Sequence, residues 1–325
     1  MRNPPGLDLD RAAPYLPLTG ATTATVISGG RSNLTYVVAA GDDKVVVRRP
    51  PLGHVLPSAH DMAREHRVIS ALSAAGFPVP RPLALCTDPE VVGAPFYVME
   101  YVDGVVLRGD GEVAPAAASA CGDALLDLLV RLHGIDHEAV GLADFGRPDG
   151  YLERQVRRWH QQWERSRTRE LPQLEEVTAR LAKELPASPK AGIVHGDYRL
   201  DNVMFDHELR EIRAVMDWEM ATIGDPLADV GLLVVYTDLA QLKLTPPVPA
   251  GFPTGAELAA RYAAATGLDA AHLDWYVAFG NFKLAVIAEG IHARYLQGKT
   301  VGAGFETFGP AVPVLIERAA ATLGE

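Results

Sequence analysis

The stretch His195-Gly-Asp-Tyr-Arg-Leu-Asp-Asn202, followed fifteen residues later by Asp217-Trp-Glu219, decides the fold that we expect for this chain. Asp197 and Asn202 lie five positions apart, so residues of one tight loop can serve two adjacent targets. We expect Asp197 to accept the proton of a substrate hydroxyl and Asn202 to hold Mg²⁺. A second carboxylate must then hold the metal ion from another side.

Asp217 has a suitable position for that second carboxylate. The runs 202–205 and 212–216 alternate like short strands, and the polar run 206–210 between them predicts a turn. Such a hairpin would carry Asp217 back to the loop. Mg²⁺ prefers oxygen ligands and keeps several waters, so one carboxylate, one amide oxygen and nucleotide phosphates suffice. Each residue alone is more typical of a turn or a helix cap than of a metal site, but the ordered set favours the metal site.

These motifs resemble those of the aminoglycoside phosphotransferase and choline kinase superfamily, whose catalytic loop reads H-G-D-x-x-x-x-N before a metal-binding aspartate. The resemblance implies an α+β chain with a bilobal, protein-kinase-like fold: a small β-rich lobe at 1–102, a hinge at about 99–104 and a larger, mainly helical lobe at 103–325. It implies an ATP- and Mg²⁺-dependent kinase that phosphorylates the hydroxyl of a small-molecule acceptor. It also implies that His195 and Asp229 brace the catalytic loop.

Length and composition agree with a two-lobed enzyme. At 325 residues the chain exceeds what one hydrophobic core usually supports, and 48% apolar residues indicate a globular protein. The formal charge of −11 argues against nucleic-acid or anionic-membrane partners. Cys86 and Cys121 are too few for a disulfide framework, and neither a signal-peptide pattern nor a membrane-span pattern is evident. We expect a cytoplasmic protein.

The first hundred residues predict a nucleotide-covering sheet. Two strands flank a glycine-containing turn, and a third strand follows at 44–48. The order of these strands predicts that backbone N–H groups of the turn cover ATP phosphates, although G-x-G-x-x-G is absent and a plain hairpin turn remains the alternative. The predicted phosphate-covering residues are Gly29, Gly30, Arg31, Ser32 and Asn33.

Arg48 ends the third strand, where kinases carry a lysine against the α- and β-phosphates. Arginine can bind phosphate bidentately, but the exchange is not conservative and leaves Lys44 as the other candidate. A helix predicted over 61–75 resembles the kinase C-helix, so Glu65 would pair with Arg48; a solvated glutamate is the alternative. Beyond it, the backbone of Glu100 and Val102 is expected to bond adenine at the hinge.

Other candidate residues lie in the predicted helical lobe. Arg199 follows Asp197 by two positions, where many kinases have a lysine that steadies the transferring phosphoryl group; a surface arginine is the alternative. His133 and His137 are four apart, but no H-E-x-x-H accompanies them, so core or surface histidines are expected rather than a zinc site.

The substrate is suggested by a local excess of arginine. Seven arginines lie between Arg147 and Arg169, against four acids through Glu170, within a chain of net charge −11. We expect Arg154, Arg157 and Arg158 to favour an anionic acceptor, whereas sites for polycationic aminoglycosides carry carboxylates. A solvated arginine face is the alternative. Trp159 and Trp163 are expected to pack against the lobe.

This arginine- and tryptophan-rich segment, the strand end at 48–51 and the motif at 217–220 look most like the kinase-like domains associated with certain acyl-CoA dehydrogenases. The resemblance implies phosphorylation of an acyl-CoA hydroxyl, such as that of a 4-hydroxyacyl-CoA, and a functional link to such a dehydrogenase. No acyl-CoA dehydrogenase domain is present in the sequence. The alternatives are an aminoglycoside kinase and a catalytically silent nucleotide-binding regulator.

Overall fold

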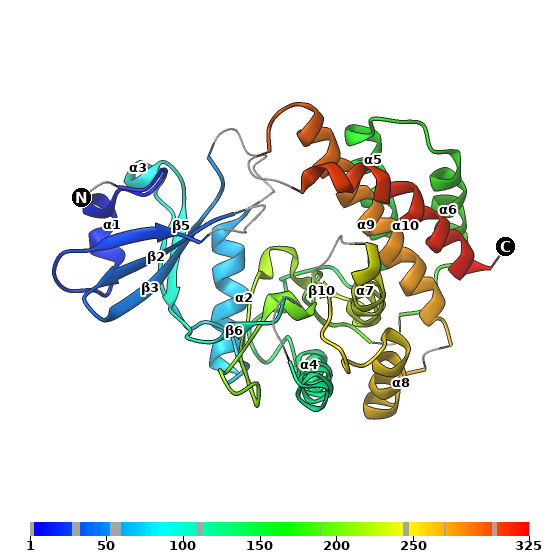
Figure 1. The fold of residues 1–325 in the computed structure, drawn as a ribbon, viewed down its shortest axis with the longest axis horizontal. Helices are drawn as coiled ribbons and strands as arrows, with labels where there is room; N and C mark the ends of the chain where they lie inside the picture. Colours follow the sequence, from blue (N-terminus) through cyan, green and yellow to red (C-terminus); the bar gives the residue numbers. More distant parts are fainter. Residues whose placement is uncertain are drawn as a thin grey trace. The chain divides into compact units, whose positions relative to one another are not determined.

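The computed structural model describes residues 3–27, 33–52, 60–108, 113–188, 190–242, 247–269, 271–300 and 304–324. The chain divides into two compact units (Figure 1). The first contains Met1–Val105, Met204–His207 and Ile212–Ala221, and the second contains Val106–Val203, Glu208–Glu211 and Thr222–Glu325.

A five-stranded antiparallel sheet forms the centre of the first unit, with strand order β1-β2-β3-β5-β4. Its strands are β1 (Thr23–Val26), β2 (Leu34–Ala40), β3 (Asp43–Arg49), β4 (Pro82–Cys86) and β5 (Phe96–Glu100). Period-two alternation turns one face inward, because Tyr36 and Val38 of β2 join Val45 and Val47 of β3 in one buried cluster. The short elements α1 (Leu9–Ala12), η1 (Ala13–Tyr15) and α3 (Pro89–Val92) complete this unit's periphery.

The helix predicted over 61–75 is present as α2 (Met62–Ala74). The Asp61 side chain accepts a hydrogen bond from the Arg64 backbone N–H, which satisfies one of the unpaired amides at the helix start. Gly76 ends the helix with a φ of 72°, a conformation that favours glycine. Glu65 is buried on α2 together with Val68, so this glutamate is not a solvated one.

The predicted hairpin is also present. In a three-stranded sheet of order β6-β8-β9, the strands are β6 (Val105–Val106), β8 (Val203–Phe205) and β9 (Ile212–Val215). Most of the hairpin, with η3 (Trp218–Met220), belongs by its contacts to the first unit, although its sequence falls within the predicted 103–325 lobe. Two long-range contacts account for this: Val215 N–H donates to the Pro78 carbonyl over 2.8 Å, and the Trp218 ring packs edge-on against Phe77.

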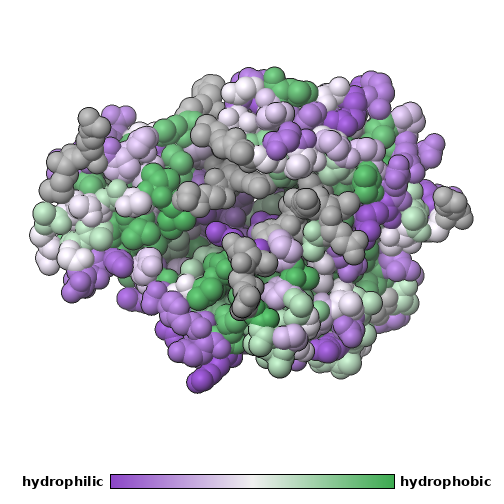
Figure 2. Space-filling view, in the orientation of Figure 1, coloured by the Kyte–Doolittle hydropathy of each residue, from purple (hydrophilic) through white to green (hydrophobic). Residues whose placement is uncertain are grey.

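Helices build most of the second unit. They are α4 (Pro115–Gly134), α5 (Tyr151–Ser166), α6 (Pro172–Lys183), α7 (Leu227–Asp238), α8 (Gly255–Thr266), α9 (Leu273–Leu296) and α10 (Phe308–Leu323). The long and mostly buried α9 packs against α7, α5 and α10, so it forms the centre of this unit (Figure 1). Hydrophilic residues cover much of the visible surface over α5, α6 and α10 (Figure 2).

Two short strands position the predicted catalytic loop. β7 (Gly192–Val194) pairs antiparallel with β10 (Thr222–Gly224), and the loop runs from β7 to the 3₁₀ helix η2 (Leu200–Asn202). The other 3₁₀ helices of the unit are η4 (Leu239–Leu242) and η5 (Phe305–Thr307). Among the described residues, no helix is both long and apolar enough to cross a membrane.

Candidate active site

The catalytic loop is anchored through its backbone. Asp229, in the first turn of α7, accepts hydrogen bonds from the backbone N–H groups of His195 and Gly196, at 2.6 and 2.8 Å. Gly196 has a φ of 83°, which a side chain would strain. These contacts fix the turn immediately before Asp197.

Asp229 is itself held as a buried carboxylate. Burial would raise its pKa, but the hydrogen bond and charge of His133, the charge of His195 and the backbone bond of His195 outweigh burial, so the pKa lies below its usual value. His133 Nε2 lies 3.3 Å from Asp229 Oδ2, and its Nδ1 lies 2.8 Å from the Tyr262 hydroxyl. His133 is therefore a core histidine, as the sequence indicated.

Asp197 has a fixed carboxylate. Its Oδ1 accepts a hydrogen bond from the Tyr236 hydroxyl at 2.6 Å, and its Oδ2 accepts one from Asn202 Nδ2 at 2.9 Å. Asn202 Nδ2 also donates to the Asp197 carbonyl at 2.8 Å. Because the amide nitrogen of Asn202 is committed to Asp197, its amide oxygen is the atom left to bind a cation.

Arg199 lies against the same carboxylate. Its Nε is 3.5 Å from Asp197 Oδ2, and its Nη2 is 3.0 Å from Asp201 Oδ2. The guanidinium carbon also stacks 4.9 Å from the centre of the Tyr236 ring. The arginine is thus held in place beside Asp197 by two carboxylates and one aromatic ring.

A small, partly open cavity adjoins this group within the second unit. Arg199, Asp201, Tyr236 and Thr237 contribute its polar lining. The remaining lining is apolar and comes from Leu107, Leu125, Leu200, Leu233, Val248 and Phe252. The lining beside the Asp197 partners is therefore mostly apolar.

In the first unit, Arg48 joins two carboxylates. Its Nε lies 3.1 Å from Glu65 Oε1, and its Nη2 lies 2.5 Å from Asp217 Oδ1. Burial opposes the charge on Arg48, but Glu65 and Asp217 outweigh burial and raise its pKa above the usual value. Burial raises the pKa of Glu65, and the Arg48 charge acts against that rise. Lys44 instead lies over the Tyr101 ring, 5.1 Å from its centre.

Asp217 has an unusual backbone conformation. Its φ of 66° and ψ of 62° lie in the left-handed region, which a non-glycine residue seldom adopts and which often marks a functional site. The neighbouring Glu219 accepts a 2.9 Å hydrogen bond from Nδ2 of the buried Asn33. The other residues of the predicted phosphate-covering turn, Gly29, Gly30, Arg31 and Ser32, lie outside the described residues.

The predicted hinge residues occupy the end of β5 and the segment after it. Glu100 N–H donates to the Arg81 carbonyl at 2.9 Å, and the Glu100 side chain accepts from Arg81 N–H at 2.9 Å. The Glu100 N–H is therefore already bonded within the unit. The adenine contacts of Glu100 and Val102 stay a prediction. Because its N–H is bonded to Arg81, Glu100 would contact adenine only through its carbonyl.

The arginines of α5 differ in their surroundings. Arg154 donates to the backbone carbonyls of Arg147 and Asp149, so its guanidinium stabilises the loop before the helix. Arg157 and Arg158 are exposed. Trp159 and Trp163 are buried, which agrees with the packing role expected of them.

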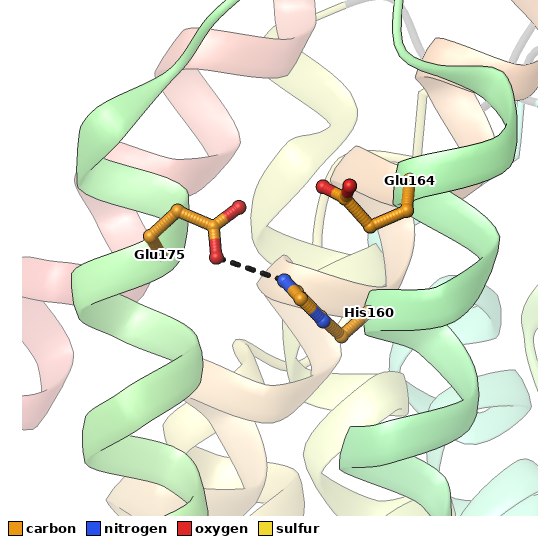
Figure 3. A group of neighbouring side chains, drawn as sticks. All are labelled: His160, Glu164 and Glu175. Carbon is orange, nitrogen blue, oxygen red and sulfur yellow. Dashed lines mark hydrogen bonds and ion pairs between the residues drawn. The ribbon is translucent and has the colours of Figure 1, made fainter.

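A second group of polar side chains lies on the α5 and α6 surface. His160 and Glu164 project from α5 toward Glu175 of α6 (Figure 3), and their ligand-type atoms all lie within 4.8 Å of one another. His160 Nε2 is 2.8 Å from Glu175 Oε2, while Arg167 lies 3.7 Å from Glu164. Ion pairing among exposed groups accounts for this cluster without a metal ion.

Two contacts of the catalytic loop were not singled out from the sequence. Tyr236 follows the apolar run of α7, and nothing in that run marks its hydroxyl as a partner of Asp197. Lys283, whose Nζ donates to the Gly196 carbonyl at 2.6 Å, had a visible signal. It interrupts a long apolar stretch, where a charge needs a specific partner.

The chain belongs to the APH phosphotransferase enzyme family, which residues 23–278 match. It is therefore a phosphotransferase with the α+β fold of that family. It is 35% identical over 315 residues to acyl-CoA dehydrogenase family member 10 of Mus musculus, and 34% identical over 281 residues to family member 11 of Homo sapiens. These alignments cover 93% and 83% of this chain but only 29% and 36% of the two relatives.

Solved structures show the same fold. A provisionally assigned aminoglycoside phosphotransferase from Ralstonia eutropha superimposes with a TM-score of 0.83 at 29% identity, covering 97% of this chain and 98% of the other. A thermostable mutant of aminoglycoside phosphotransferase APH(4)-Ia, in ternary complex with AMP-PNP and hygromycin B, gives 0.63 at 15% identity, covering 94% of each chain. The second likeness supports the fold alone.

Proposed function

We propose that this phosphotransferase transfers the γ-phosphate of ATP, with Mg²⁺, to the hydroxyl of a small anionic acceptor with an apolar part, such as a 4-hydroxyacyl-CoA. The observation that carries the proposal is the Asp197 carboxylate, held by Tyr236 and Asn202 on a loop whose backbone Asp229 anchors. A carboxylate fixed in this way can orient a hydroxyl and accept its proton.

Positioning does most of the work in this mechanism, because phosphoryl transfer asks for little covalent chemistry from the protein. Asp197 orients the acceptor oxygen and takes its proton as the bond from that oxygen to the γ-phosphorus forms, while the bond from the γ-phosphorus to the bridging oxygen breaks and ADP leaves. Arg199, held beside Asp197 at 3.5 Å, supplies a fixed positive charge that offsets charge on the phosphoryl oxygens. Neither residue has to move far to act.

The donor atoms fit a hard divalent cation. Asn202 offers an amide oxygen and Asp217 a carboxylate, which is the oxygen chemistry that Mg²⁺ prefers. Along the chain Asn202 directly precedes β8 and Asp217 comes two residues after β9, and these strands are neighbours in one sheet. When bound, Mg²⁺ would neutralise phosphate charge. Arg48 contacts Oδ1 of Asp217, so the other carboxylate oxygen, Oδ2, would hold the metal ion.

Arg48, rather than Lys44, is proposed to bind the nucleotide phosphates. It is the basic residue of β3 that contacts Glu65, as the lysine of protein kinases pairs with the glutamate of their C-helix. Lys44 lies over Tyr101 instead. An arginine presents several N–H donors in a planar fork, so Arg48 can hold Glu65 and still reach a phosphate oxygen. The phosphate-covering role of residues 29–33 stays part of this proposal.

Two features of the second unit support the acceptor class. The lining of the small cavity beside Arg199 and Tyr236 is mostly apolar, and such a lining suits a hydrocarbon chain better than a polycationic sugar. The exposed Arg157 and Arg158 would attract phosphate groups such as those of coenzyme A. The relatives' names, which include acyl-CoA dehydrogenase, also connect the family with acyl-CoA chemistry. A functional link to such a dehydrogenase belongs to the same proposal.

A screen for ADP release tests the acceptor class. The purified protein with ATP and Mg²⁺ is offered 4-hydroxyacyl-CoAs of increasing chain length, kanamycin, hygromycin B, choline and simple sugars. We expect turnover with the hydroxyacyl-CoAs, and kcat/KM that rises with chain length until the cavity is filled. Preference for an aminoglycoside would establish an antibiotic kinase instead. Nucleotide binding without turnover on any acceptor would support a regulatory module.

A further inference from the structure

Lys283 is a charged residue in an apolar place. It lies in α9, and between Trp275 and Ala288 it is the only charged residue of the sequence. Its side chain is buried, at 8% exposure. Burying an ammonium group costs free energy unless a partner compensates, so the position requires a specific reason.

Two contacts compensate the burial of Lys283. Its Nζ donates a 2.6 Å hydrogen bond to the carbonyl of Gly196, and it lies 5.4 Å from the centre of the Trp159 ring. The ring of a tryptophan attracts a cation placed over its face. Burial lowers the pKa of Lys283, while the nearby charges of Asp197 and Asp229 act in the opposite direction.

The bonded carbonyl belongs to the peptide group that joins Gly196 to Asp197. The N–H of that same peptide group donates to His195 Nδ1 at 3.2 Å, and the preceding peptide N–H is held by Asp229. Lys283 therefore completes the set of contacts that fix the backbone on the amino-terminal side of Asp197. No contact of Lys283 with the Asp197 carboxylate itself is needed for this effect.

We infer that Lys283 is a positioning residue for phosphoryl transfer, which fixes the Gly196–Asp197 peptide group and is itself oriented by the Trp159 ring. The inference rests on the proposed function for its catalytic consequence, but the anchoring of the loop can be measured without any substrate. It also assigns a role to Trp159 beyond packing. Effects on turnover should follow from effects on the loop.

A simple packing role predicts a different pattern. If Lys283 only filled space, an apolar side chain of equal length would replace it best, and Lys283→Met would equal or exceed Lys283→Gln. Glutamine can still donate an N–H to the Gly196 carbonyl, whereas methionine cannot. The donor role therefore predicts that Lys283→Gln retains more loop order and more turnover than Lys283→Met.

Hydrogen exchange of the free protein gives the substrate-independent readout. Wild type, Lys283→Met, Lys283→Gln and the exposed control Lys299→Met are compared by mass spectrometry over peptides that contain 194–199. We expect exchange at least about fivefold faster in Lys283→Met, an intermediate rate in Lys283→Gln and no change in the control. Equal exchange in all four proteins would overturn the inference.

Turnover gives the second readout, with ADP release measured first with water as the phosphoryl acceptor and then with any acceptor found. We expect Lys283→Met to lower kcat at least tenfold while the Kd for MgATP, from calorimetry, changes less than twofold. Faster exchange over 194–199 with an unchanged kcat would overturn the inferred effect of Lys283 on phosphoryl transfer. If the wild-type protein bound no MgATP, the proposed function would be refuted. The exchange measurement would still decide whether Lys283 anchors the loop.

Trp159→Leu keeps the test decisive if Lys283→Met does not fold. This variant keeps the lysine and its hydrogen bond but removes the ring over the ammonium group. We expect faster exchange over 194–199 and a severalfold lower kcat, with the Kd for MgATP again nearly unchanged. Exchange and kcat equal to those of wild type would contradict the role given to the ring.

Discussion

Three side-chain contacts fix the half-buried carboxylate of Asp197. Tyr236 contacts Oδ1, whereas Asn202 and Arg199 contact Oδ2, so both oxygens have defined partners. Such preorganisation lowers the cost of orienting a hydroxyl at the moment of reaction. The same contacts mean that a change at Asp197 affects chemistry more than folding.

For Asp197→Asn we predict a fall in kcat of roughly 10² to 10⁴, the usual contribution of general base catalysis. The substitution keeps the shape of the side chain but removes the proton-accepting carboxylate. The Kd for MgATP should stay within a few-fold, because the loss concerns the acceptor. Steady-state ADP release and calorimetry measure both quantities, and an unchanged kcat would move the base elsewhere.

Arg48 carries a second prediction at this scale. In Arg48→Met no cation remains to contact Glu65 and the phosphates, and a hydrogen bond to a charged group contributes about 1.5–3 kcal/mol. We therefore expect the KM for MgATP to rise about tenfold or more. Lys44→Met is the control, and it should leave this KM unchanged. The reverse ranking of the two variants would assign the phosphates to Lys44.

At the residue scale the sequence indicated those side chains that stand in an ordered motif. Asp197, Asn202 and Asp217 were singled out because spacing and order constrain them, and their roles stay predictions. The contact of Arg48 with Glu65 was expected from the resemblance of the helix to the kinase C-helix, and it is present. Tyr236 could not be predicted, since only the tertiary path of α7 brings its hydroxyl to Asp197. For Arg154, a count of charges could not reveal that backbone carbonyls hold its guanidinium.

Helix α7 connects the catalytic loop to the stability of the second unit through Asp229. The folded state lowers the pKa of this carboxyl, so the ionised carboxylate stabilises the fold. This contribution is complete at pH values above the pKa of the unfolded chain, about 4, and it is lost as pH falls through the lower pKa of the folded state. We predict that wild-type stability declines more steeply below about pH 4 than that of Asp229→Asn. Urea unfolding between pH 3 and 6 measures the difference, and parallel profiles would contradict it.

Helix α5 provides a test of the acceptor's charge. Because Arg154 serves the loop before the helix, the variant to examine is Arg157→Glu with Arg158→Glu. We expect a several-fold rise in KM for the acyl-CoA acceptor, little change for MgATP, and a similar rise when salt shortens the reach of exposed charges to about 8 Å. The control double variant Lys183→Glu with Arg318→Glu has the same change of charge on exposed positions. Equal acceptor KM values in both double variants would exclude the arginine site.

Elements were predictable where local signals agreed. Asp61 at the start and Gly76 at the end bounded α2, and polar residues between two alternating runs gave the β8–β9 hairpin. The membership of that hairpin in the first unit was not predictable, because it depends on Val215 and Trp218 meeting residues that are more than a hundred positions earlier. Sequence order is a poor guide to such long-range contacts.

At the scale of the whole molecule, this chain spans about a third of the relatives named acyl-CoA dehydrogenase. The alignments cover most of this chain, so the matched segment of those relatives shares its phosphotransferase fold. A transferase that phosphorylates a hydroxyacyl-CoA converts a poor leaving group into a good one.

The most direct test of the central claim follows the phosphoryl group itself. The protein is incubated with Mg²⁺, ATP labelled with ¹⁸O at the γ-phosphate and a 4-hydroxyacyl-CoA, and the acyl-CoA is analysed by mass spectrometry beside an Asp197→Asn control. The account predicts a phosphorylated acyl-CoA that carries the labelled phosphoryl oxygens, together with an equal amount of ADP, and product that is lower by about 10² or more in the control. Labelled inorganic phosphate without phosphorylated acceptor, or equal product in the Asp197→Asn control, would contradict it.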